Sequence, residues 1–319
     1  MRKLLRAAVL GLAVLAGASV VSSPSLAEGL KFIFVSHGQA NDPFHSIVKN
    51  GAYQSAKDVG AELDYRAPQT FDMVQMAQLI DAAVNQHPDG LIVTIPDADA
   101  LGPSIKRAVD AGIPVIAVNS GLERGPQLIQ QLGVLVYVGQ DERLAGVRAG
   151  EKLKALGGKK AICINPEVGN VTLDVRCEGF KEGFGGTVQV LPTRIDQADI
   201  EAKVRAALSS DPEIDTVLGE SAPFGGEQAV KVVGELGLEG KVHVGTFDLS
   251  ADVLKAVADG RIAFCIDQQP FLYGYEAVSL LRLYHDYGLL PVSNIITGPR
   301  FITKEMAAQV IELSAKAIR

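Results

Sequence analysis

Polar and aromatic side chains recur at the positions where predicted buried strands end. Asp42 and Phe44 follow the first such strand, Asn119 follows the fourth, and Asp248 and Gln268 follow two strands in the second half of the chain. Carboxylates and amides can pair with several hydroxyl groups, and an aromatic ring can cover the C–H face of a sugar ring. The pattern therefore indicates a site for a neutral, polyhydroxylated small molecule.

The motifs of the common nucleotide-binding and hydrolytic sites are absent from the sequence. The first strand-end loop, Ser36–Gln39, contains no GxGxxG, and neither a P-loop nor a GxSxG nucleophile elbow occurs elsewhere. Gly183–Gly186 is rich in glycine but follows a predicted helix, which is typical of a turn. His37, His45 and His243 lack zinc-ligand spacing. We therefore expect no enzyme, no cofactor and no metal; a secreted α/β enzyme is the alternative, which turnover of a bound sugar would support.

The first 27 residues have the three parts of a secretory signal peptide. Basic residues precede an apolar run, Ala7–Val21, and Ser25–Ala27 fits the small-x-Ala cleavage pattern. The run is short for the roughly 20 residues that a membrane span needs. We therefore expect residues 1–27 to be removed, and the mature chain to begin at Glu28 and to reside in the periplasm.

Three cysteines, Cys163, Cys177 and Cys265, follow this predicted signal. An oxidising compartment permits a bridge between Cys163 and Cys177, and an odd number leaves at least one thiol unpaired within a monomer. The alternative is that all three are small buried apolar residues. The sequence leaves both arrangements open.

After Glu28, short apolar runs alternate with helical patterns. Leu30–Ser36 and Gly90–Ile95 are typical of buried strands, and Asp42 followed by Pro43 is typical of a helix start. We expect two series of five strands in tandem, hence an α/β fold of two parallel sheets covered on both faces. The net charge of −7 and the lack of a Lys/Arg cluster after the signal disfavour nucleic acid as a partner.

Several segments, in their order and spacing, resemble the sugar-binding periplasmic proteins of ABC transporters, especially the ribose-binding-like group. These segments are Asn41–His45, Pro88–Val93, Pro96–Asp99, Ala111–Ile116, Arg176–Phe180, Val244–Asp248 and Asp267–Pro270. The resemblance implies the type I periplasmic binding protein fold, which has two Rossmann-like, doubly wound parallel-sheet lobes joined by three hinge crossovers. It implies an N-terminal lobe of residues 28–139 and 270–296, and a C-terminal lobe of residues 140–269 and 297–319.

The resemblance also implies a ligand site made by side chains from both lobes and the hinge. These are Asp42, Phe44, His45, Asn119, Arg176, Ser221, Asp248 and Gln268. Asn119-Ser120 stands where ribose binders carry an Asp followed by an Arg, His45 stands where a second stacking aromatic is usual, and Ser221 falls near an Asn of the family. These departures point away from ribose itself and towards a differently substituted pentose, a hexose, a sugar alcohol or another polyol.

The resemblance implies capture of a small sugar or polyol in the periplasm and its delivery to the membrane permease of an ABC transporter. The alternative is a sensory binding protein that presents its closed form to a chemoreceptor or a sensor kinase. A sugar-responsive repressor shares the fold, but it would need a DNA-binding headpiece where this chain has a predicted signal peptide. We expect a monomer.

Overall fold

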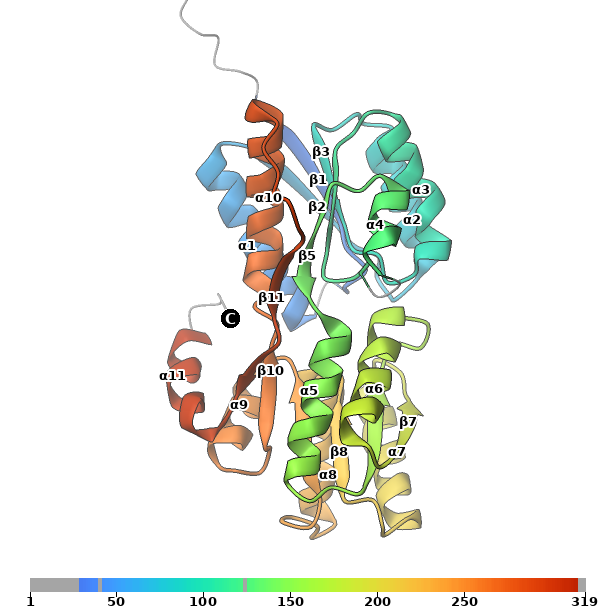
Figure 1. Cartoon of the computed structure of the whole chain (residues 1–319), viewed down its shortest axis with the longest axis vertical. Helices are drawn as coiled ribbons and strands as arrows, with labels where there is room; N and C mark the ends of the chain where they lie inside the picture. Colours follow the sequence, from blue (N-terminus) through green and yellow to red (C-terminus); the bar gives the residue numbers. More distant parts are fainter. Residues whose placement is uncertain (1–28, 40–41, 123–124, 315–319) are drawn as a thin grey trace, which may run out of the picture.

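The computed structural model describes residues 29–39, 42–122 and 125–314. They form two α/β lobes, which lie one above the other in Figure 1. The predicted signal peptide, residues 1–27, lies outside the described residues. Within the described part of the chain, no helix combines the length and the apolar character needed to cross a membrane.

The N-terminal lobe is built on a sheet of six strands whose neighbours all run parallel. Side chains alternate between the faces of a strand, and here both faces are covered. Phe32 and Phe34 pack under one helical layer, and Ile33 and Val35 under the other. The strands are β1 (Lys31–Val35), β2 (Glu62–Arg66), β3 (Gly90–Val93), β4 (Val115–Val118), β5 (Val136–Gln140) and β11 (Ile295–Gly298). The helices are α1 (Pro43–Val59), α2 (Met73–Val84), α3 (Ala98–Asp110), α4 (Pro126–Leu132) and α10 (Pro270–Tyr287).

The C-terminal lobe repeats this plan, except that its edge strand β12 (Arg300–Ile302) runs antiparallel to its neighbour β10. The other strands are β6 (Lys160–Asn165), β7 (Thr187–Pro192), β8 (Thr216–Gly219), β9 (His243–Phe247) and β10 (Phe264–Asp267). The helices are α5 (Glu142–Ala155), α6 (Val171–Phe184), α7 (Gln197–Ser210), a π-helical turn η1 (Ala222–Gly226), α8 (Glu227–Glu235), α9 (Ala251–Ala258) and α11 (Lys304–Ser314).

The chain passes between the two sheets three times. It leaves β5 for α5 at Gln140–Asp141, β10 for α10 at 268–269, and β11 for β12 at Pro299. These crossovers meet at the middle of the molecule, where β5 and β11 run side by side (Figure 1). The predicted fold class is therefore confirmed. The expectation of five strands per sheet is wrong. After both series of strands are complete, β11 adds a sixth strand at one edge of the N-terminal sheet and β12 adds one at an edge of the C-terminal sheet.

Helices α5 and α6 touch backbone to backbone. A Cβ atom on Gly146 of α5 would lie 2.2 Å from the carbonyl oxygen of Arg176, and one on Gly183 of α6 would lie 2.0 Å from that of Val147. Only glycine permits this approach, because a real Cβ atom needs well over 3 Å. The contact places Arg176 one turn from the start of α5, where Glu142 stands.

Candidate functional site

A cavity lies between the lobes, at the carboxyl ends of strands from both sheets, where α/β proteins bind their ligands. About 490 Å³ of space between the atoms lies within it, including the part open to solvent. All eight predicted site residues line it. These are Asp42, Phe44, His45, Asn119, Arg176, Ser221, Asp248 and Gln268.

The N-terminal wall is positioned by the first turn of α1. Asp42 has extended backbone, and its Oδ1 accepts a hydrogen bond of 2.9 Å from the backbone N–H of Phe44. Asp42 is therefore both the N-cap of α1 and a cavity-lining carboxylate. The ring of Phe44 packs edge to face against His45 and Tyr273, with centroids 5.2 and 5.9 Å apart, which fixes an aromatic surface at the cavity.

Two buried histidines stand behind this surface. His45 Nδ1 lies 3.0 Å from Ser36 Oγ, and His37 Nδ1 lies 2.8 Å from Thr94 Oγ1. Thr94 Oγ1 also accepts from the backbone N–H of His37 at 2.9 Å, so this hydroxyl holds both the ring and the backbone of His37. Burial lowers the pKa of both histidines, and for His37 the neighbouring His45 lowers it further. Both rings are therefore neutral at pH 7.

The C-terminal wall centres on Arg176 of α6, whose side chain is 3% exposed. Its Nε donates to Glu142 Oε2 at 2.5 Å, Nη2 donates to Gln268 Oε1 at 3.0 Å, and Nη1 donates to the carbonyl oxygen of Glu220 at 3.3 Å. The guanidinium also lies 4.4 Å from the ring centroid of Phe247, at cation–π distance. Burial alone would lower the pKa of Arg176, but Glu142 raises it above its ordinary range. Arg176 is thus a fixed, charged donor.

Three carboxyl groups on the wall have raised pKa values, chiefly because they are buried. Burial raises the pKa of Glu167 to about 7, against a 2.6 Å hydrogen bond from Asn170. Burial raises that of Asp248 to about 7 as well, against Arg176 and a 2.5 Å hydrogen bond from Gln268, and the pKa of Glu220 is raised well above its ordinary value. Near pH 7 these groups can carry a proton, so they can donate hydrogen bonds to hydroxyl groups as well as accept them.

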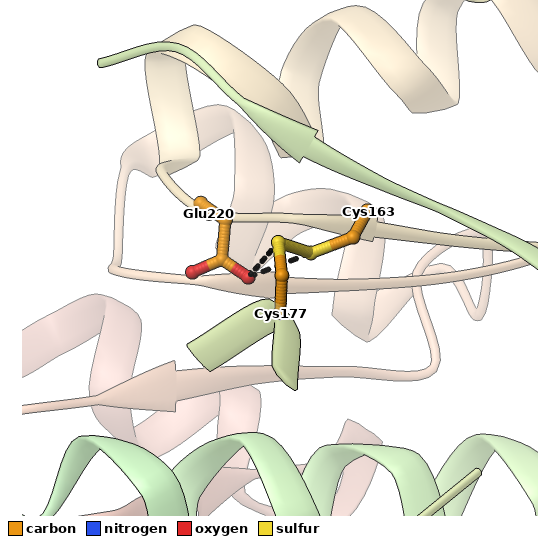
Figure 2. A group of neighbouring side chains, drawn as sticks. All are labelled: Cys163, Cys177 and Glu220. Carbon is orange, nitrogen blue, oxygen red and sulfur yellow. Dashed lines mark hydrogen bonds between the residues drawn. A yellow bond between two sulfur atoms is a disulfide. The ribbon is translucent and has the colours of Figure 1, made fainter. Parts of the chain in front are cut away.

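A disulfide lies directly behind the C-terminal wall. It joins Cys163 of β6 to Cys177 of α6, and Figure 2 shows both sulfur atoms facing the carboxyl group of Glu220. Glu220 Oε1 lies 3.1 Å from Cys163 Sγ and 3.7 Å from Cys177 Sγ. Of the two arrangements that the sequence left open, the structure has the disulfide between Cys163 and Cys177. Cys265 is a buried free thiol. Because bridged sulfurs offer no thiolate, this cluster is not a ready metal site.

Replacing both Cys163 and Cys177 by alanine is expected to lower the free energy of unfolding by about 3 kcal/mol, the entropic contribution of closing a loop of roughly this length. Thermal unfolding with and without a thiol reductant measures this. The reductant should lower the midpoint of the wild type and leave that of the double variant unchanged. Equal midpoints for the double variant and the oxidised wild type would contradict the prediction.

Nine cavity residues are additional to the predicted set, among them His37, Glu167, Asn170 and Glu220. Each of these four lies between a strand and the helix that follows it, so the strand-end rule that selected the other residues also applies to them. Their residue types alone did not mark them as site residues, because a lone histidine or a glutamate in a loop most often has a structural role. His37 Nε2 and Glu167 Oε2 face each other across the cleft at 3.9 Å.

Comparison with known proteins identifies the family. Residues 32–287 match the periplasmic binding protein domain. The xylose/arabinose-binding protein XylF of Sulfolobus acidocaldarius is 26% identical over 288 residues, covering 86% of this chain and 71% of its own. The ribose import binding protein RbsB of Escherichia coli is 27% identical over 268 residues, covering 82% and 86%. A carbohydrate transporter from Acidothermus cellulolyticus 11B, crystallised with myo-inositol, is 35% identical with a TM-score of 0.85, covering 91% of this chain and 100% of its own. This chain therefore belongs to the periplasmic binding protein domain family.

Proposed function

We propose that this protein captures a small sugar or polyol between its two lobes and delivers it to the membrane permease of an ABC transporter, without enzymatic turnover. The observation that carries the proposal is the composition of the cavity between the lobes. Its wall combines an aromatic face, a fixed guanidinium and carboxyl groups that can both accept and donate hydrogen bonds. These are the groups that a molecule bearing several hydroxyls and a C–H face requires.

Ligand binding would act by shifting a population of open and closed forms. Asp42 and Phe44 belong to the N-terminal wall, and Arg176 and Asp248 to the C-terminal wall, so a small ligand meets both sets only when the lobes close. Binding then favours the closed form by the difference in affinity. The lobes also touch directly, since the backbone N–H of Val171 donates to the carbonyl oxygen of Pro96 at 3.1 Å.

The charges on the wall favour a neutral ligand. Arg176 is paired with Glu142 at 2.5 Å, and no lysine or second arginine of the described residues lines the cavity. An anionic sugar would therefore meet carboxyl groups without a free counter-charge. We propose neutral pentoses, hexoses and cyclitols as the class. The names of relatives that bind xylose, arabinose and ribose, and the myo-inositol complex, support this choice.

The proposal also covers where in the cell the protein works and how its chain is divided between the two lobes. Residues 1–27 would act as a cleavable signal peptide that directs the protein to the periplasm, where it would work as a monomer. The N-terminal lobe would comprise residues 28–139 and 270–296, and the C-terminal lobe residues 140–269 and 297–319; these bounds fall one residue before the end of β5 and two residues before the end of β11. The membership of β11 and β12 in separate sheets supports a last crossover close to this boundary. No described feature favours a chemoreceptor as partner over a permease.

A thermal-shift screen of the mature protein tests the proposed function. The panel comprises D-ribose, D-xylose, L-arabinose, D-glucose, xylitol and myo-inositol, with D-gluconate as the anionic control and an amino acid and a nucleoside as other classes. A ligand that binds only the native state adds about 4 kcal/mol at a thousandfold excess over its Kd, so at least one neutral polyol should raise the midpoint by several degrees. A shift with the amino acid or the nucleoside alone would overturn the ligand class.

A further inference from the structure

Glu142 is a buried carboxylate that stands next to the cavity without lining it. Its side chain is 2% exposed, and it does not belong to the cavity wall. One of its oxygens, Oε2, accepts from Arg176 Nε at 2.5 Å and from Gln140 Nε2 at 2.7 Å. Gln140 ends β5 and Glu142 begins α5, so the hydrogen bond between them spans the first crossover, while the bond from Arg176 lies within the C-terminal lobe.

The hydrogen bonds of Arg176 show what Glu142 does for it. A guanidinium has five N–H groups in one plane. One is taken by Glu142, one by Gln268 and one by the carbonyl oxygen of Glu220. Two N–H groups are then left for a molecule in the cavity. Since the bond from Nε to Glu142 fixes the rotation of the plane, it decides which N–H groups face the cavity.

The same network reaches the other two crossovers. Gln268, which accepts from Arg176, lies in the second crossover, and its carbonyl oxygen accepts from Thr297 Oγ1 of β11 at 2.7 Å. Gln269 Nε2 in turn donates to the carbonyl oxygen of Thr297. The orientation of the guanidinium is therefore tied to the arrangement of all three hinge segments.

We propose that Glu142 is a positioning residue for ligand capture: it does not touch the ligand but holds the guanidinium of Arg176 in the orientation that binds it. The inference rests on the proposed function, and it deepens it by naming a residue of the hinge that sets affinity. It differs from a purely structural role, in which Glu142 only compensates the buried charge of Arg176. The two roles predict different results for Glu142→Gln: loss of charge compensation alone would lower stability and leave the affinity of the folded protein unchanged, whereas loss of positioning would also weaken binding.

The affinity of Glu142→Gln distinguishes these roles, and a double-mutant cycle tests whether Glu142 acts through Arg176. Isothermal titration with D-ribose, D-xylose, L-arabinose and myo-inositol is applied to the wild type, Glu142→Gln, Arg176→Met and the double variant. We expect Glu142→Gln to weaken binding about tenfold, and the double variant to bind no more weakly than Arg176→Met, within about threefold, because coupled residues are not additive. Additive losses would overturn the inference.

Glu182→Gln is the matched control. Arg143 Nη2 and Glu182 Oε2 form a 2.7 Å ion pair between the same two helices, α5 and α6, but both side chains are 56% exposed and lie outside the cavity wall. This variant should bind with the affinity of the wild type. A tenfold loss here would assign the effect of Glu142→Gln to loosened helix packing and would overturn the inference.

Glu142→Asp decides the question if Glu142→Gln does not fold. It keeps the negative charge but withdraws the carboxylate by one methylene group, so it compensates Arg176 without holding it in place. We expect a folded protein that binds about tenfold more weakly than the wild type. Wild-type affinity in Glu142→Asp would leave only a structural role. Failure of the wild type to bind any sugar of the panel would overturn the proposed function itself, which is a different result from additivity.

Discussion

Replacing Gly146 by alanine is expected to lower the free energy of unfolding by about 2–3 kcal/mol, the upper part of the range for overpacked sites. The new methyl carbon would lie 2.2 Å from the carbonyl oxygen of Arg176 and 2.9 Å from the amide nitrogen of Phe180. Both neighbours are backbone atoms of α6, so relief requires the helices to move apart. Denaturant unfolding followed by circular dichroism measures the change.

Gly234→Ala is the control for the change in helix propensity. Gly234 lies within α8 and is exposed, and a Cβ atom there would meet only the end of the Glu239 side chain, at 3.5 Å. Alanine is the better helix former by about 1 kcal/mol, so this variant should be more stable than the wild type. The prediction fails if the two variants shift stability in the same direction.

Replacing Asp248 by alanine is expected to weaken sugar binding at least about a hundredfold, since hydrogen bonds to an ionisable group contribute more than neutral ones. Asp248 lines the cavity, and its Oδ1 accepts from Gln268 at 2.5 Å. The substitution removes a proposed ligand partner and leaves the Gln268 amide without its acceptor. Titration calorimetry with the sugar selected by the screen measures the loss.

Asp248→Asn separates this loss from backbone strain. Asp248 has φ of 65°, a left-handed conformation that asparagine tolerates and alanine resists. The asparagine variant should therefore keep the stability of the wild type, while its affinity falls between those of the wild type and the alanine variant. Undiminished affinity in Asp248→Ala would remove Asp248 from the proposed site.

Most elements of the fold were predictable because their ends carry local signals. The expected strand Leu30–Ser36 corresponds to β1, and the expected strand Gly90–Ile95 corresponds to β3. Strand β5 ends at the buried side chain of Gln140, which belongs to a polar network that an apolar pattern does not include. Strands β11 and β12 were missed, because they lie at sheet edges and bury only one residue each, whereas the short strands β3, β4, β8 and β10 are buried throughout.

The cavity-lining residues that directly follow a strand could be predicted from their place in the sequence. Residues whose role depends on a contact with another helix could not. Parallel strands bring their carboxyl ends together, so Asp42, Asn119 and Asp248 could be grouped before any distance was known. Glu142, in contrast, has the sequence signature of an ordinary acidic residue in the first turn of a helix. Its contact with Arg176 depends on the close approach of α5 and α6, which the apolar patterns used to predict helices do not reveal.

The three crossovers have a consequence for the order in which the protein can be assembled. Helix α10, which comes from the last fifth of the chain, covers the same sheet face as α1, and the carbonyl oxygen of Phe271 lies 2.0 Å from where a Cβ atom of Gly51 would be. Until α10 arrives, Phe32 and Phe34 lack part of their cover. A chain emerging from its N-terminus therefore cannot complete its first lobe early, and such a delay would suit the export to the periplasm that we propose.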